Sequence, residues 1–522
     1  MGVRMRSARR WAVVLAVGSG VLGGCEDSDP PVDPLPDSGS VDSGTPDAGG
    51  AQGDDGGTQV EVDAGTDAGS LGEPLPCEKT QGVCSGARRA LVDGAYEPVC
   101  TALSYGADYE ASETRCDGLD NDCDGVTDPP PSWSQVASLG WPPHAGRISS
   151  LRVTEGVLAV VFDREVVARV IQMDTAMTPL GTTEIPVEVQ DDVLALDTVS
   201  TRLLRTSQGP ALYYSSAGPN GDHTRGHLIL LDEQGHRVPR EGEPEGGALL
   251  FDQTVGDRAT AAAVSADGTR IFSAWRNSSS FVSGGREVRG ALTELNGQSV
   301  VAPRVLMQAI AKDTVLYGVD VMGLRDGGFV VLAQEIKDGA VEGLLRLQRF
   351  DAGLQPVGDE RTFPSEANPE TRLVDLGAAA GDALASPAIV LRGIQAGQRV
   401  LTVLGNLFGE VSNRTLATTT PMEASWAGTA VTSRGLEAAW LSVSRNSQES
   451  DPLFSWRGRF WALGKEGVPA DLTPGPEYLP LHRYAQWVQL QELPERWMGA
   501  LVMTSTKSPL SHTLQAVRYC AP

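Results

Sequence analysis

The chain has 522 residues, of which 41% are hydrophobic and 6% aromatic, so it is long enough to bury a sizeable core in two or three domains. Its formal net charge of −25 and its pI near 4.6 argue against nucleic acid or an anionic membrane surface as partner, because a negative field repels both. The charge is unevenly placed, since thirteen acids and no Lys or Arg lie between Glu26 and Pro76.

The N-terminus has the pattern of a bacterial lipoprotein signal. Four arginines within the first ten residues precede the apolar run Trp11 to Leu22, which is too short to span a bilayer. The run ends in Leu22-Gly23-Gly24-Cys25, which resembles a lipobox, although an ordinary small-residue cleavage site is the alternative. We therefore predict a signal peptide over residues 1–25, lipidation of Cys25, and anchoring to the outer membrane, facing the periplasm or the cell surface.

The next segment, residues 26–76, is built mainly of Asp, Ser, Gly, Pro, Thr and Ala, with the tripeptide D-A-G starting at Asp47, Asp63 and Asp67. It lacks the apolar residues that would offset the entropy of ordering the chain. We predict a disordered acidic stalk with an r.m.s. reach of roughly 40 Å.

The most specific chemical pattern is C-D-G-L-D-N-D-C-D-G-V-T-D, from Cys116 to Asp128. Acids at alternate positions followed by glycine are typical of a calcium loop, although Pro131 takes the place of the usual final Glu and no helical pattern flanks the loop. Oxygen donors favour Ca²⁺ over copper or zinc, and the alternative is a solvated acidic turn. The predicted ligands are the side chains of Asp120, Asp122, Asp124 and Asp128 and the carbonyl of Val126.

A resemblance to a known family begins at these residues. The segment Glu113 to Asp128, preceded by Gly82 to Arg89 and Tyr105 to Glu110, resembles the MopE-type metal-binding motif of lipoproteins from multicellular, myxobacterial-type delta-proteobacteria. The resemblance implies a metal-binding module in a lipoprotein, and some family members are associated with copper. The chain departs from the pattern at Leu91, where a further cysteine is expected, and at Pro129, where an acid is usual. Calcium remains the favoured ion.

Six cysteines remain besides Cys25, and an even number in a secreted protein predicts three disulfides. Cys116 and Cys123 bracket the acidic loop, so we expect them to pair with each other. Two further bridges then lie among Cys77, Cys84, Cys100 and Cys520, and one of the first three must reach the C-terminus. Residues 77–132 are too few to depend on a hydrophobic core, so disulfides, each worth roughly 2 to 4 kcal/mol, and an ion are expected to hold them.

From Trp133 onward a unit of short strands repeats. Turns near Asp174, Asp232, Glu294, Asp351, Gly405 and Gly464, with Cys520 in the seventh place, recur at spacings of 54 to 62 residues. Each unit has room for four antiparallel strands, which predicts an all-β, seven-bladed β-propeller over residues 133–522, with two β-sandwiches as the alternative. The apolar strand that opens each unit is expected at Gly156–Phe162, Pro210–Tyr214, Thr269–Trp275, Gly328–Ala333, Pro387–Leu391, Gly435–Trp440 and Trp497–Val502.

The last unit has no residues for an outer strand, because only Ala521 and Pro522 follow Cys520. The segment Trp133 to Leu139 has the pattern to fill that place by pairing with the C-terminal strand. This pairing would bring Cys520 beside the cysteine-rich module, where a disulfide could hold the ring shut.

Motifs for catalysis are missing from the sequence of the large domain, which contains no G-x-S-x-G, H-E-x-x-H or P-loop pattern. We interpret His223 and His227 as residues of a solvated loop rather than a metal pair. Tryptophans in predicted strands are interpreted as packing residues rather than sugar platforms: Trp275, Trp440, Trp456, Trp461 and Trp497.

Three functional classes remain open, because a fold does not choose among them. We favour a monomeric binding or adhesion protein whose propeller takes a protein or polysaccharide, and we expect no enzyme activity. The alternatives are an extracellular hydrolase or lyase with its site on the propeller axis, and a metal-scavenging lipoprotein.

Overall fold

The computed structural model describes residues 72–127 and, with gaps, residues 132–520, within one compact unit, Leu71–Pro522. The predicted signal peptide, the lipidation site Cys25 and nearly all of the predicted stalk lie outside the described residues. Within the described part of the chain, no helix is both long and apolar enough to cross a membrane.

Short elements make up the cysteine-rich module. They are the 3₁₀-helix η1 (Gly82–Cys84), the strands β1 (Leu91–Val92) and β2 (Ala95–Tyr96), which pair with each other, and the helix α1 (Ala102–Tyr105). The rest of the module is loops and turns, so its order depends on disulfides and side-chain hydrogen bonds rather than on extended secondary structure.

The large domain is all-β. Its described strands form seven antiparallel sheets, six with four strands and one with three. In chain order the first four sheets contain β4 (Ser149–Val153), β5 (Gly156–Asp163), β6 (Val167–Met173) and β7 (Pro179–Pro186); β8 (Thr201–Thr206), β9 (Gly209–Ala217), β10 (Thr224–Leu230) and β11 (Ala248–Gln253); β12 (Thr260–Val264), β13 (Arg270–Asn277), β14 (Glu287–Glu294) and β15 (Ser299–Gln308); and β16 (Thr314–Gly323), β17 (Phe329–Lys337), β18 (Glu342–Phe350) and β19 (Pro356–Glu366).

The remaining three sheets contain β20 (Glu370–Asp375), β21 (Pro387–Gln395), β22 (Gln398–Gly405) and β23 (Ser412–Ala417); β24 (Ala424–Thr432), β25 (Gly435–Ser444) and β26 (Ser455–Leu463); and β27 (Tyr484–Glu492), β28 (Trp497–Ser505), β29 (His512–Cys520) and β3 (Ser132–Leu139). A short 3₁₀-helix, η3 (Pro494–Arg496), connects β27 and β28. The seven strands predicted from the sequence fall on β5, β9, β13, β17, β21, β25 and β28, which are the second strands of the seven sheets.

Both faces of β5, the second strand of the first sheet, are buried, which explains its continuous apolar sequence. In β5, Val157, Ala159 and Val161 pack with residues of β28 and β29, such as Leu501 and Leu514. The alternate residues Leu158, Val160 and Phe162 pack with residues of the next sheet, including Leu212 and Ile229. Since side chains alternate across a strand, each sheet contributes one face to each of two neighbouring cores.

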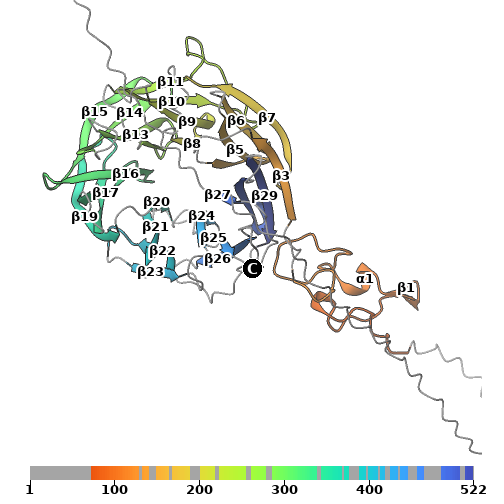
Figure 1. Ribbon diagram of the computed structural model, residues 1–522. Coiled ribbons are helices and arrows are strands. Elements are labelled where there is room, and N and C mark those ends of the chain that lie inside the picture. The colour runs from red at the N-terminus through yellow and green to blue at the C-terminus, as the bar shows by residue number, and fades with distance from the viewer. Residues whose placement is uncertain are drawn as a thin grey trace, which may run out of the picture. The chain divides into compact units, whose positions relative to one another are not determined.

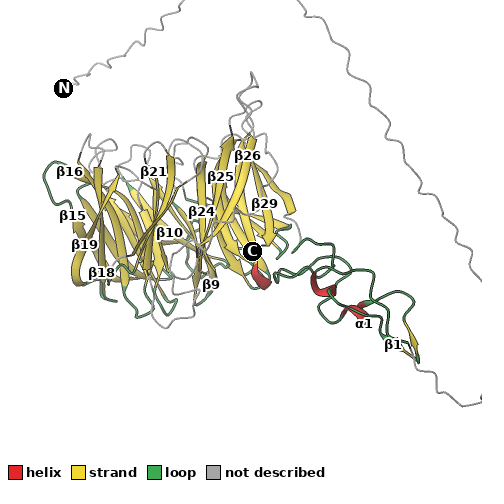
Figure 2. Cartoon of the chain, turned by 90° about the horizontal axis from the view of Figure 1, so that it is seen from below, coloured by secondary structure: helices red, strands yellow, loops and turns green. Residues whose placement is uncertain are grey.

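The sheets follow one another around a ring (Figure 1), and the strands run between two sets of loops (Figure 2). The first strands of neighbouring sheets contact one another in the pairs β4 and β8, β8 and β12, β12 and β16, β16 and β20, β24 and β27, and β27 and β4. The architecture is therefore β-propeller-like.

A five-residue turn after the third strand recurs in four successive sheets. The first residue, Asp174, Asp232, Glu294 or Asp351, donates its N–H to the carbonyl four residues on and accepts from the N–H three residues on. The fourth residue has a positive φ: 63° at Met177, 86° at Gly235, 87° at Gly297 and 58° at Leu354. The regular spacing in the sequence therefore records one hairpin geometry, a turn closed by a left-handed residue.

The prediction that Trp133 to Leu139 completes the last sheet is confirmed. Strand β3 pairs antiparallel with β29, with Trp133 opposite Val517 and Leu139 opposite His512. A segment from the start of the large domain thus supplies the fourth strand of its final sheet. The apolar cluster shared by β5, β6, β28 and β29 lies between the first and last sheets.

Candidate metal centre

All six described cysteines form disulfides, as predicted, but the predicted pair Cys116–Cys123 is wrong, and so is the prediction that Cys77, Cys84 or Cys100 pairs with Cys520. The bonds are Cys77–Cys100, Cys84–Cys123 and Cys116–Cys520. Cys84 ends η1, and the neighbouring Val83 N–H donates to the Asp120 carbonyl at 3.1 Å, which brings Cys84 rather than Cys116 against the acidic loop. Cys116 instead packs among Trp497, Leu514 and other core residues of the large domain.

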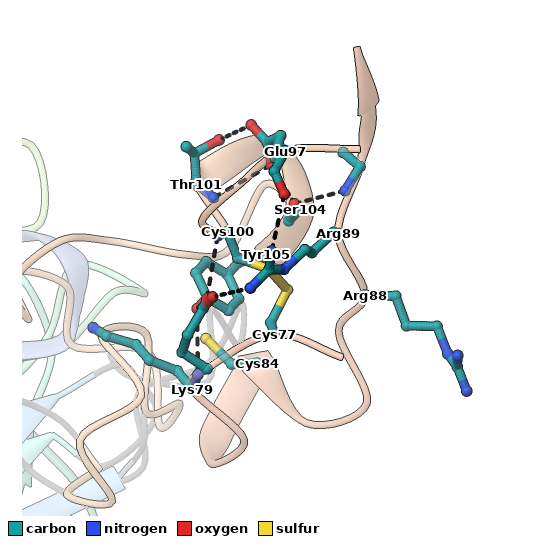
Figure 3. Close-up of a disulfide and its surroundings, with 12 residues drawn as sticks. Cys77, Lys79, Cys84, Arg88, Arg89, Glu97, Cys100, Thr101, Ser104 and Tyr105 are labelled. Carbon is teal, nitrogen blue, oxygen red and sulfur yellow. Dashed lines mark hydrogen bonds and ion pairs between the residues drawn. A yellow bond between two sulfur atoms is a disulfide. The ribbon is translucent and has the colours of Figure 1, made fainter. Parts of the chain in front are cut away.

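Hydrogen bonds around Cys77–Cys100 fix the framework on which the loop rests (Figure 3). The Glu78 carboxylate accepts from the Arg89 guanidinium at 2.8 Å and from the Cys100 N–H at 3.2 Å. The Glu97 carboxylate accepts from the Thr101 hydroxyl at 2.6 Å and from the Ser104 hydroxyl, and these bonds lower the pKa of Glu97. Side-chain hydrogen bonds thus replace regular secondary structure here.

Three carboxylates meet beside the Cys84–Cys123 bond. One carboxylate oxygen each from Glu113, Asp120 and Asp122 lies within 4.8 Å of the others, and Asp120 is buried. The Asp120 carboxylate accepts from the N–H groups of Asp124 at 3.1 Å and Gly125 at 3.0 Å. The loop therefore wraps around the Asp120 side chain, and the Asp120 carboxylate lies buried inside the loop.

Glu113 is the ligand candidate that the sequence count missed. Its Oε2 accepts from the N–H groups of Asn121 at 2.8 Å and Asp122 at 3.2 Å. Its Oε1 is buried and has no hydrogen-bond partner among the described residues. Burial, together with the charges of Asp122 and Glu110, raises the pKa of Glu113 despite these hydrogen bonds. Its position at the start of the segment Glu113 to Asp128, which carries the resemblance to the MopE-type motif, was the available sequence signal.

The other predicted ligands are not gathered in this way. Asp124 is exposed, and its Oδ1 accepts from the Val126 N–H at 2.8 Å in a local turn. Val126 has an exposed side chain, and Asp128 lies outside the described residues. Within residues 72–127, the structure brings together Asp120 and Asp122 from the predicted set and adds Glu113.

The donor set suits a hard cation. All candidate donors are oxygens, three of them carry negative charge, and the orphaned Glu113 Oε1 lacks a partner that an ion could supply. The backbone is shaped for the loop, because Gly125 has a φ of 93° and a Cβ there would lie 2.1 Å from Gln81 Oε1. Glu113, Asp120 and Asp122 are therefore the residues that would hold a hard cation.

The interpretation of His227 as a solvated loop residue is wrong. His227 lies in β10, is 1% exposed, and stacks on Tyr214 with ring centroids 4.8 Å apart, whereas His223 contacts Asp252 at 3.2 Å. Neither ring nitrogen of His227 has a partner among the described residues. Trp275 and Trp497 are buried, which confirms the packing interpretation for these two; the side chains of Trp440, Trp456 and Trp461 lie outside the description.

Buried His227 should make stability depend on pH. Burial and the Arg225 charge lower its pKa to about 4, against about 6.5 in the unfolded chain. The unfolded state therefore binds the proton first, so this residue's contribution is complete above pH 6.5 and is lost as the pH falls towards 4. We expect the His227→Phe variant to lose less stability than the parent between pH 7 and pH 4, by about 3 kcal/mol, in urea titrations.

The control is His236→Gln, which replaces an exposed histidine in the turn after β10. It should retain the pH dependence of the parent protein. Equal slopes for the parent and the His227→Phe variant would contradict the buried, neutral imidazole.

Comparison with known proteins gives only distant likenesses. No family model and no curated protein matches the chain. A puromycin hydrolase structure is 14% identical with a TM-score of 0.37, and the match covers 70% of this chain and 51% of that one. Prolyl oligopeptidase B from Galerina marginata is 11% identical with a TM-score of 0.41, and the match covers 73% of this chain and 50% of that one.

An α-L-arabinanase from Penicillium chrysogenum is 10% identical with a TM-score of 0.40, and the match covers 74% of this chain and 98% of that one. The chain therefore spans about half the length of the puromycin hydrolase and the oligopeptidase, at 51% and 50%, and nearly all of the arabinanase.

Proposed function

We propose that this chain is a membrane-anchored extracytoplasmic lipoprotein in which a calcium-stabilised module fastens a seven-bladed β-propeller used for binding or adhesion. Lipidation of Cys25 is supported by the lipobox-like sequence, and the metal-binding role by the MopE-type pattern. The main supporting observation is the carboxylate cluster of Glu113, Asp120 and Asp122, in a module that is bonded to the last strand through Cys116–Cys520.

Closure into seven blades is supported by the chain topology. Seven successive sheets meander in sequence order, and β3 joins the final sheet. The first strands of the last and first sheets, β27 and β4, contact each other, as they do in a closed ring. A closed ring has no exposed sheet edges at its joints, which suits a rigid surface for a partner.

A cation in this cluster has a structural role in the proposal. The cluster adjoins Cys84–Cys123, and Lys79 Nζ donates to the Asp122 carbonyl at 2.5 Å. An ion in the cluster would therefore stabilise the acidic loop against the segment that contains Lys79 and Cys84. A metal-scavenging function would use the same residues, but the Cys116–Cys520 disulfide to the large domain favours a structural role for the ion. For a hydrolase or lyase, the axis pocket formed by the described strands supplies one acid, Asp320, paired with Arg202.

Calcium should raise the melting temperature of detergent-purified full-length protein after dialysis against EGTA. Binding to the folded state alone stabilises it by about 2.7 kcal/mol at a hundredfold excess over Kd. Glu113→Gln and Asp120→Asn should each weaken calcium binding at least tenfold, because a ligand charge is lost. Calorimetric titration and thermal melting measure both effects.

Asp93→Asn is the matched control, because Asp93 is an exposed acid in the β1–β2 turn of the same module. It should bind calcium as the parent protein does. A melting temperature raised by Cu²⁺ and unaffected by Ca²⁺ would assign the site to copper, and no response to either ion would exclude a cation role.

A further inference from the structure

A cavity of about 190 Å³ lies where five first strands come together, namely β4, β8, β12, β16 and β27. These strands belong to five different sheets of the ring, so the cavity lies on the inner side of the sheets. Its polar lining includes Ser150, Thr201, Arg202, Tyr213, Asp320 and Gln489.

Two hydroxyl groups of this lining, Ser150 Oγ and Thr201 Oγ1, are buried without a hydrogen-bond partner among the described residues, and a third, Tyr213 Oη, is buried beside the Thr260 hydroxyl. Tyr213 is only 1% exposed, and burial raises its pKa, so it stays a neutral phenol that can donate and accept. Buried hydroxyls without partners destabilise a fold unless water or a ligand completes them. The cavity therefore presents hydroxyl groups from three strands, and those from β4 and β8 are unused.

The charges in the cavity are already compensated. Arg202 Nη2 lies 3.4 Å from Asp320 Oδ1, and Arg202 Nη1 donates to the Ala262 carbonyl at 2.8 Å. Asp320 also accepts from the N–H groups of Val321 at 2.9 Å and Leu373 at 2.8 Å. A ligand with its own charge would have to separate this pair, so the lining favours a neutral molecule that carries many hydroxyl groups.

We infer that the cavity binds one ring of a neutral sugar, which its hydroxyl groups and the Arg202–Asp320 pair hold by hydrogen bonds. This deepens the proposed binding role of the propeller and rests on it. A cavity of about 190 Å³ has room for several ordered waters, and hence for the hydroxyl groups of one sugar ring that would replace them.

Detergent-purified full-length protein tests this with glucose, galactose, mannose, N-acetylglucosamine and myo-inositol, beside the charged probes glucuronate and glucose 6-phosphate. At least one neutral probe should bind with a Kd of about 1 mM or tighter, and each charged probe at least tenfold more weakly. Tyr213→Phe removes one hydroxyl of the lining, so it should weaken sugar binding by about 5- to 30-fold and lower the melting temperature less than Tyr214→Phe does. Saturation-transfer NMR and calorimetry give these values.

Tyr214→Phe is the matched control on the same strand. The Tyr214 hydroxyl donates to the Gly246 carbonyl at 2.6 Å and accepts from the Glu188 N–H at 3.0 Å, and Tyr214 is not part of the lining. It should lower the melting temperature and leave the sugar Kd unchanged. Absence of binding by every neutral probe, stronger binding of a charged probe, or an unchanged Kd in Tyr213→Phe would each overturn the inference. Calcium-dependent melting is measured separately, so its loss would count against the proposed module instead.

Discussion

Replacing both Cys116 and Cys520 by serine should lower the free energy of unfolding by about 6 kcal/mol, as the chain-entropy relation gives for this loop length. The Cys116–Cys520 bond joins residues 404 positions apart, so it restricts the unfolded chain more than any shorter cross-link can. It also fastens the end of β29, the strand to which β3 is added. Guanidinium titrations of the oxidised parent and the double variant, followed by tryptophan fluorescence, measure the difference.

The matched comparison is the Cys77→Ser, Cys100→Ser variant, whose bond spans only 23 positions within the module. The chain-entropy relation gives that bond about 3.5 kcal/mol, and its loss should leave the unfolding of the large domain largely unchanged. If the Cys116 and Cys520 variant is no less stable than this one, the bond to the C-terminal strand does not hold the last sheet.

The repeat could be predicted from the sequence because it depends on local geometry. Turns such as Asp232 to His236 and Asp351 to Gln355 use the same backbone hydrogen bonds and a fourth residue with positive φ. A second strand such as β5 is buried on both faces, so it appears as an unbroken apolar run. The repeat also showed that the last unit lacks an outer strand. The segment that forms β3 could therefore be predicted to pair with the C-terminal strand, β29.

Disulfide partners and the third carboxylate could not be predicted in the same way, because they depend on contacts between distant segments. The turn at η1 places Cys84 next to Cys123, and Cys116 packs in the core of the large domain. Glu113 lies outside a loop count that starts at Asp120, and it joins the cluster through N–H groups of Asn121 and Asp122. The spacing of residues along the sequence does not show which distant segments will contact each other.

Arg346→Met should lower the free energy of unfolding by about 3 to 5 kcal/mol, because it leaves a buried carboxylate without its partner. The side chains of Arg346 and Glu335 are 6% and 2% exposed, and Arg346 Nη1 lies 2.6 Å from Glu335 Oε2. Arg346 also forms two bonds to Glu360, at 2.6 and 2.7 Å, and donates to the Gln308 carbonyl at 2.5 Å. It therefore links its own sheet to the end of β15 in the preceding one. Urea titrations at pH 7 measure the loss.

A second substitution separates the buried charge from the lost contacts. Glu335→Gln added to Arg346→Met removes the unpaired charge, so the double variant should recover part of the stability that the single variant loses. Lys337→Met serves as the control on β17, the strand of Glu335, since its ion pair with Asp313 is exposed, at 65% and 58%, and solvent screens such pairs. Equal effects of Arg346→Met and Lys337→Met would mean that the link between the third and fourth sheets does not depend on the Arg346 charge network. The part of the stability that the double variant recovers measures the cost of burying Glu335 without its cation, and the remainder measures the lost bonds of Arg346 to Glu360 and Gln308.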